Sequence, residues 1–127
     1  MDKKIIFTDK APAPIGPYNQ AVLVNGTLYT SGQIASNPAT GELLLDSIEV
    51  ETEQVMQNLS ALLEAANMTF DNVVKATIFI MNMGDFARIN AVYGKYFKEE
   101  IAPARETVQV ATLPKNVNIE ISVIAVK

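Results

Sequence analysis

The 127-residue chain contains no cysteine and no histidine, and these two absences narrow its possible chemistry. Without cysteine there is no disulfide framework, no thiolate metal site and no thiol nucleophile. Without histidine, the Ser/His/Asp triad, the HExxH zinc site and the usual general base at neutral pH are excluded. Any catalysis must therefore use carboxylates, hydroxyl groups, the backbone and water.

The chain also lacks long apolar runs and an excess of positive charge. No run approaches the roughly 18 apolar residues of a membrane span. The first residues, "MDKKIIFTDK", hold only three consecutive apolar residues, too few for a signal peptide. Ten basic residues against fourteen acidic ones give a net charge of −4, which repels polyanions. We therefore expect a cytoplasmic protein that binds neither membranes nor nucleic acid.

The length and the 49% hydrophobic content predict a single domain over residues 1–127 with a substantial core. Apolar periodicity and turn residues predict its elements. We expect strands at 3–7, 21–24, 27–34, 72–81, 105–113 and 117–126, helices at about 50–68 and about 85–99, and a stiff proline-rich loop at 9–20. Asn25-Gly26 favours a type I′ hairpin turn, and Asp85 is a plausible N-cap of the second helix. Glu49, Glu51 and Glu53 are interpreted as a solvated helix start, favourable near the positive end of the dipole.

This order of elements predicts an α+β fold, a two-layer sandwich in which one mixed sheet of about six strands carries two helices on one face. In the last strand, Val117, Ile119, Ile121 and Val123 point to one side, but Ile124 and Val126 point to the other. Because both faces are apolar, we expect other subunits of a symmetric homo-oligomer to bury the second face.

Two charged residues lie in apolar strands and need an explanation. Alternation places Arg105 and Thr107 on one face of their strand and Glu106 on the other. Glu120 lies between isoleucines, where a carboxylate needs a partner, a bound water or a function. Arg105 and Glu120 could form a structural ion pair, or each could merely cap an exposed end of the sheet. Alternatively, Arg105 anchors a small carboxylate through two parallel hydrogen bonds, and Glu120 handles protons or positions a water.

Four further residues each have a structural and a functional interpretation. Tyr18 is either a loop aromatic packed on the core or part of a site. Ser31 and Gly32 form either a strand end that needs a bend or part of that site. Asn90 is a poor helix former beside an apolar face, so its side chain could bond something specific.

Six segments together resemble one family: "APAPIGPYNQA", "LYTSGQI", "VVKATIFI", "FARINAVYGKYF", "PARETVQVATLP" and "IEISVIAV". In nearly the whole chain, and in the same order, they are similar to the reactive-intermediate deaminases, the Rid or YjgF-type proteins. The resemblance implies a chorismate-mutase-like fold and a homotrimer whose sheets form a central barrel, with ligand clefts between subunits.

The resemblance also implies an activity: the hydrolysis of 2-imino acids such as 2-iminopropanoate and 2-iminobutanoate, and of their enamine tautomers, to 2-keto acids and ammonia, with no cofactor and no metal. Carried over by motif, Arg105 grips the substrate carboxylate and Glu120 positions or protonates around the attacking water. The other residues expected in the cleft are Tyr18, Ser31, Gly32, Asn90 and Thr107. Imines already hydrolyse in water, so positioning and general acid–base help of about 10²–10⁴-fold suffice.

The chain departs from the common family pattern at four positions. It has Glu106 and Thr107 where "PARSC" is frequent, Ala35 where a proline often follows "GQI", and Ser122 where a glutamate is frequent. Two other functions compete with the deaminase. The clefts could sense small 2-keto acids without turnover, or the protein could be an endoribonuclease or translation inhibitor. The negative charge and the absence of histidine stand against RNA.

Overall fold

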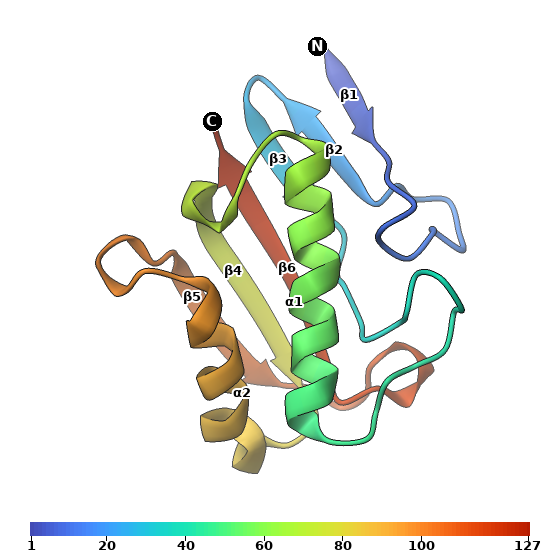
Figure 1. Cartoon of the computed structure of the whole chain (residues 1–127), viewed down its shortest axis with the longest axis vertical. Coiled ribbons are helices and arrows are strands. Elements are labelled where there is room, and N and C mark those ends of the chain that lie inside the picture. Colours follow the sequence, from blue (N-terminus) through green and yellow to red (C-terminus); the bar gives the residue numbers. More distant parts are fainter.

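The computed structural model describes all 127 residues, which form one mixed six-stranded sheet with two helices on one face (Figure 1). In chain order the elements are β1 (Lys3–Ile6), β2 (Ala21–Val24), β3 (Thr27–Thr30), α1 (Ile48–Ala65), β4 (Val73–Ile80), α2 (Phe86–Tyr93), β5 (Ala104–Gln109) and β6 (Ile119–Val126). The strands are arranged β1-β2-β3-β6-β4-β5. Only β4 and β5 pair in parallel. The predicted α+β two-layer sandwich is therefore confirmed.

The core lies between α1 and the centre of the sheet. Ser47 caps α1, because its side chain accepts the Val50 N–H at 3.1 Å. The helix packs on β6, and one apolar stripe of it is fully buried, as its helical spacing predicts. The stripe consists of Val55, Met56, Leu59, Leu62 and Leu63. None of the helices combines the length and the apolar character that a membrane crossing requires.

The hairpin of β2 and β3 turns as predicted. Asn25 and Gly26 both have positive φ angles, 50° and 80°, which the two central residues of a type I′ turn require. Its outer strand pairs with β1 and its inner strand with β6, so the amino-terminal half of the chain extends the sheet on one side. This places the loop between β1 and β2 at the sheet's end.

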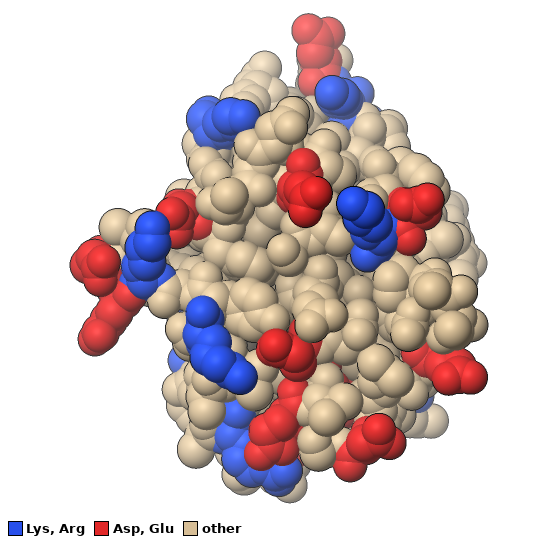
Figure 2. All heavy atoms as spheres, viewed as in Figure 1, with Lys and Arg blue, Asp and Glu red and all other residues tan.

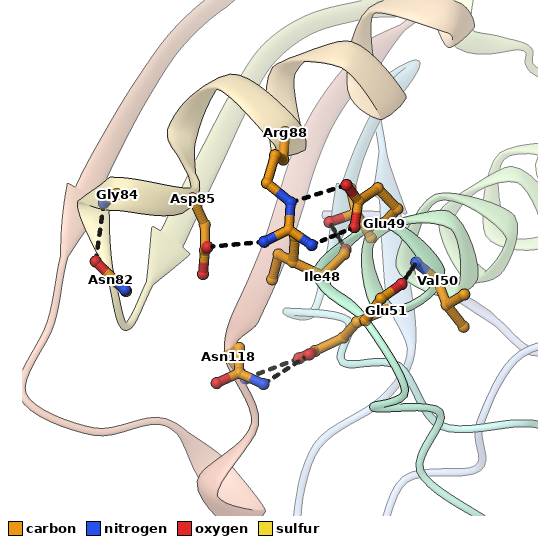
Figure 3. A network of polar contacts seen from close by, with 11 residues as sticks. Ile48, Glu49, Val50, Glu51, Asn82, Gly84, Asp85, Arg88 and Asn118 are labelled. Atoms are coloured by element: carbon orange, nitrogen blue, oxygen red, sulfur yellow. Dashed lines mark hydrogen bonds and ion pairs between the residues drawn. The ribbon is translucent and has the colours of Figure 1, made fainter.

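Several predicted boundaries were wrong. The second helix ends at Tyr93 because the chain tightens at Gly94 into the 3-10 turns Gly94–Tyr96 and Glu99–Ile101. Asp85 makes no capping hydrogen bond; its carboxylate instead lies 3.6 Å from the Arg88 guanidinium. The preceding turn is capped by the side chain of Asn82, which accepts the Gly84 N–H at 2.8 Å (Figure 3).

The predicted exposure of Glu51 was wrong, and one apolar residue of β4 points away from the core. Glu51 is fully buried and not solvated, because its carboxylate bonds to the start of β6. Val74 does not continue the apolar face of its strand. A register shift against β6 turns Val73 to the core and leaves Val74 48% exposed.

The face of the sheet opposite the helices carries apolar side chains that this single chain does not cover. Phe79 of β4 lies in register with Val108 of β5 and with Glu120 of β6, and residues directly opposite in neighbouring strands point to the same face. On the same face, Val108 and Val126 are each more than 40% exposed. We call this surface the open face.

Candidate functional site

The guanidinium of Arg105 is held by three side chains of α2. Its Nη1 donates to Asn90 Oδ1 at 2.6 Å. Its central carbon lies 5.0 Å from the ring centre of Tyr93 and 5.6 Å from that of Phe86, within the range of cation–π attraction. Phe86, Asn90 and Tyr93 share one helix face at spacings of four and three residues. Arg105 is therefore fixed in place with most of its donors unused.

The other arginine of the chain is neutralised, and the contrast is informative. Arg88 forms a two-pronged ion pair with Glu49 and lies close to Asp85 (Figure 3). No carboxylate lies within 4.0 Å of the Arg105 guanidinium. A partly buried cation held by an amide and two aromatic rings, with no counter-ion in its own chain, is suited to binding an external carboxylate.

Two hydroxyl groups near this arginine have no protein partner. Thr107 Oγ1 and Tyr93 Oη are both buried without a hydrogen bond to another protein group. Burial raises the pKa of Tyr93 to about 12, opposed by the Arg105 charge, so this phenol keeps its proton and can donate it in a hydrogen bond. Buried hydroxyls are rarely left unsatisfied in proteins. We call Arg105, Asn90, Tyr93 and Thr107 the arginine half-site.

Glu120 lines a separate pocket of about 360 Å³ at the end of the sheet. Tyr18 and Gly32 line it too, together with Pro114 and Lys115 of the turn before β6. Burial raises the pKa of the Glu120 carboxyl, because removal from water disfavours the charged form. We call Tyr18, Gly32 and Glu120 the glutamate half-site.

Gly32 has a steric reason to be glycine. A Cβ atom built on it would lie 2.7 Å from Glu120 Cδ, closer than real contacts allow. The backbone leaves β6 at this point and rejoins it at Gln33, which exchanges two hydrogen bonds with Ile121. Across the gap, the Thr30 hydroxyl accepts the Val123 N–H at 2.9 Å and so replaces a backbone partner. This irregularity makes room for the Glu120 carboxylate.

Gln20 holds the loop that carries Tyr18 in place through hydrogen bonds. The sequence analysis did not identify this residue. Gln20 is 2% exposed. Its Nε2 donates to the carbonyls of Thr8, Ala11 and Pro12, and its Oε1 accepts the Thr8 N–H at 2.9 Å. Ser31 joins the same loop to β3, because its hydroxyl donates to the Asn19 carbonyl at 2.6 Å. No pattern in the sequence distinguishes Gln20 from an exposed loop glutamine.

The seven predicted site residues thus fall into two groups. Arg105, Asn90 and Thr107 lie together, and so do Tyr18, Gly32 and Glu120, with Ser31 beside them. Arg105 pairs in register with Ala76, which faces the helices, whereas Glu120 points to the open face. The two charged residues therefore lie on opposite faces, and the alternative of a structural ion pair within one chain was wrong.

The surface over the helices has no basic patch. Figure 2 shows acidic and basic side chains interspersed on this face, with no continuous stripe of one sign. No group of three or more acidic side chains is placed to hold a metal ion.

Comparisons with known proteins agree with this architecture. The sequence pattern of the endoribonuclease L-PSP family matches residues 8–127. A Lactococcus lactis protein named as a proposed regulator, AldR, is 59% identical over 122 residues, which are 96% of each chain. A Bos taurus 2-iminobutanoate/2-iminopropanoate deaminase is 48% identical over 125 residues, 98% of this chain and 90% of that one.

A solved structure gives the same result for the fold. The crystal structure of E. coli TdcF with bound serine superimposes with a TM-score of 0.91 at 44% identity, covering 98% of both chains. The chain therefore belongs to the endoribonuclease L-PSP family, also called the YjgF/RidA or Rid family, and has its chorismate-mutase-like fold.

Proposed function

We propose that the protein hydrolyses small 2-imino acids, such as 2-iminopropanoate and 2-iminobutanoate, to 2-keto acids and ammonia. Arg105 binds the substrate carboxylate with two parallel hydrogen bonds. The observation that carries the proposal is that Arg105 is held by Asn90 and two aromatic rings but has no acidic partner. A relative named as a 2-imino acid deaminase and a structure described with bound serine support an amino-acid-like ligand.

The chemistry needs only a positioned carboxyl group and water. The ionised Glu120 takes a proton from a water molecule while the oxygen of that water bonds to the carbon of the protonated imine. The C=N electron pair moves to nitrogen. Glu120 then returns the proton to that nitrogen. The C–N bond breaks with its electron pair going to nitrogen, and the ionised Glu120 takes the proton of the hydroxyl group as the 2-keto acid forms. This proton passes to the ammonia, which leaves as ammonium. A pKa raised by burial suits a group that must both accept and return a proton.

The active site is formed between two copies of the chain. Arg105 and Glu120 lie on opposite faces of one sheet, so one substrate cannot touch both within a single chain. The apolar open face gives copies a surface on which to associate. We propose a homotrimer in which the arginine half-site of one subunit meets the glutamate half-site of its neighbour. Tyr18, Ser31, Gly32, Asn90 and Thr107 line the shared cleft.

A binding role without turnover is the second candidate, favoured by the 59% identity to a protein named as a regulator. It uses Arg105 in the same way but does not need Glu120 for ligand affinity. Endoribonuclease activity, which the family's name suggests, is the third candidate, and the net charge of −4 weighs against it.

Competition with a chemical trap tests the proposed function. The imines are generated in place by an amino-acid oxidase and captured by semicarbazide, with wild type, Arg105→Ala and Glu120→Ala added in turn. The proposal expects wild type to reduce semicarbazone formation and both variants to lose this effect. An inert wild type whose melting temperature still rises with 2-oxobutanoate supports the binding role instead. Cleavage of RNA that Arg105→Ala abolishes would support the ribonuclease.

A further inference from the structure

Two acidic residues of the first turn of α1 bond to other elements of the fold. Figure 3 shows Glu49 bonded to Arg88 of α2 and Glu51 bonded to Asn118, immediately before β6. Glu49 and Glu51 leave this turn in different directions. Neither residue lies in the candidate site, and neither is used in the proposed reaction. Glu51 nevertheless bonds to the strand that carries Glu120, and Glu49 bonds to the helix whose side chains hold Arg105.

Glu51 bonds to the beginning of β6. Its Oε2 accepts the backbone N–H groups of Asn118 at 2.7 Å and Ile119 at 3.2 Å, and its Oε1 accepts Asn118 Nδ2 at 2.8 Å. The Glu51 side chain is fully buried. A buried carboxylate is tolerated when several donors satisfy it. These contacts fix the two residues that immediately precede Glu120.

Glu120 is consequently held from both sides along its strand. Before it, Ile119 is bonded to Glu51, and the Asn118 carbonyl accepts the Met81 N–H at 3.0 Å. After it, Ile121 exchanges hydrogen bonds with Gln33. The carboxylate of Glu120 itself has no hydrogen-bond partner in the chain. Its position is therefore set by the backbone that these neighbours hold.

Glu49 bonds to α2. Its two oxygens accept from Arg88 Nε at 2.8 Å and Nη2 at 2.6 Å. Arg88 lies two residues before Asn90, whose side chain holds Arg105. The ion pair joins the amino-terminal ends of the two helices, and thereby fixes the helix from which Phe86, Asn90 and Tyr93 reach Arg105.

We propose that Glu49 and Glu51 are positioning residues that set the two half-sites of one chain from a single helical turn. Glu51 sets the reacting carboxylate of Glu120 through Asn118 and Ile119. Glu49 sets the carboxylate anchor Arg105 through Arg88 and Asn90. The inference rests on the proposed function for its kinetic readouts, and each arm also has a readout that needs no turnover.

The Glu51 arm is tested with Glu51→Met, which removes all acceptors at similar size, and Glu51→Gln, which removes the charge but keeps an acceptor. With Gln, a rotated Asn118 amide can accept from the new NH₂ group. We expect Glu51→Met to lower kcat at least about tenfold with little change in the Kd of 2-oxobutanoate. Glu51→Gln should stay within about threefold of wild type.

Equal loss in both variants, or none in Glu51→Met, would overturn this arm. Asn118→Ala, which removes only one of the three donors, covers the case in which Glu51→Met does not fold. It should lower kcat by a smaller factor with Kd unchanged. Melting temperatures are recorded for each variant, and assays are run well below them. If Glu51 only stabilises the fold, its variants lower the melting temperature but do not lower kcat while leaving Kd unchanged.

The Glu49 arm is tested with Glu49→Gln, for which two explanations predict opposite changes in the Kd of 2-oxobutanoate. Loss of a negative charge by itself strengthens the binding of an anion. Loss of the ion pair with Arg88 removes the contact that fixes α2, and so weakens the binding of the anion. We expect the second effect to dominate, so that the Kd of 2-oxobutanoate rises at least about threefold while kcat at saturation changes little. Glu64→Gln is the matched control, since it makes the same charge change at an exposed position of α1. Unchanged or tighter binding in Glu49→Gln would overturn this arm.

A carbon-detected NMR titration of the Glu120 carboxyl separates failure of this inference from failure of the proposed function. In Asn118→Ala, which keeps every charge, a loosened strand admits water, and the pKa of Glu120 should fall toward its ordinary value. If wild type does not hydrolyse imines but this shift and the Glu49 effect on Kd appear, only the proposed function fails. If wild type turns over and neither effect appears, only this inference fails.

Discussion

Arg105 and Glu120 lie on β5 and β6, the two strands that flank β4, but point to opposite faces of the sheet. Arg105 pairs with Ala76 and lies under α2, whereas Glu120 pairs with Phe79 on the open face. A chain with this arrangement has two incomplete half-sites. Association of copies through the open face would therefore complete the catalytic centre as well as bury apolar surface, so activity and assembly should be lost together.

Arg105→Lys should fail as a conservative replacement. Lysine keeps the charge but not the planar fork that binds both carboxylate oxygens and stacks on Tyr93 and Phe86. We expect the Kd of 2-oxobutanoate, measured by calorimetry, to rise at least about tenfold, in line with the 1.5–3 kcal/mol of a charge-assisted hydrogen bond. Affinity equal to wild type would mean that Arg105 acts only as a point charge.

Gly32→Ala should impair turnover with little effect on folding. The new methyl group would lie 2.7 Å from Glu120 Cδ, so the carboxylate has to move. We expect kcat to fall at least about tenfold, since small misplacements of a reacting group are costly. Gly94→Ala is the matched control, because nothing lies within 4 Å of its added methyl group and its φ of −62° is helical. Equal kcat in the two variants contradicts the assigned role of Gly32.

The activity should show an acid limb that belongs to Glu120. Burial raises the pKa of this carboxyl above its ordinary value of 4.5. The first step needs the ionised form, so kcat/KM, which reports the free enzyme, should fall as pH drops through a midpoint above 4.5. A pH–rate profile measures this midpoint, and Glu120→Gln should abolish the limb together with most of the activity. A limb that persists unchanged in Glu120→Gln would assign it to another group.

Acid should weaken the ion pair between Glu49 and Arg88, which joins α1 to α2. The hydrogen bonds from Arg88 lower the pKa of Glu49 from 4.5 to about 2. A carboxyl whose pKa is lower in the folded state stabilises the fold above its unfolded pKa, and that stabilisation is lost as pH falls from about 4.5 through about 2. The melting temperature should therefore drop less steeply between pH 5 and pH 3 in Glu49→Gln than in Glu64→Gln. Parallel curves would show that the pair does not contribute.

Local signals in the sequence were sufficient for most of the fold. The Asn25-Gly26 turn, the apolar stripe of α1 and the alternation in β5 each depend on neighbouring residues, and each was predicted correctly. Alternation also predicted that Arg105 and Thr107 share a face. The end of α2 was missed because the periodic aromatic residues beyond Gly94 continue to suggest a helix.

Relationships between distant segments could not be predicted in this way. Glu51 looked like a solvated residue because its partners, Asn118 and Ile119, lie 67 and 68 positions away. Alternation gives the faces within each strand, but the relation of Arg105 to Glu120 depends on β6 pairing with β4. That strand order is a property of the folded sheet. The ion-pair alternative stayed open until this register was known.

Complementation between two inactive variants tests the shared site most directly. Arg105→Ala and Glu120→Ala are unfolded together, refolded as a mixture and assayed against each protein refolded alone. If each site takes Arg105 from one subunit and Glu120 from its neighbour, random mixing of equal amounts restores both residues in about a quarter of the sites. We predict recovery of about a quarter of the wild-type activity. A mixture as inactive as its components, although native mass spectrometry shows mixed oligomers, would contradict a site shared between copies.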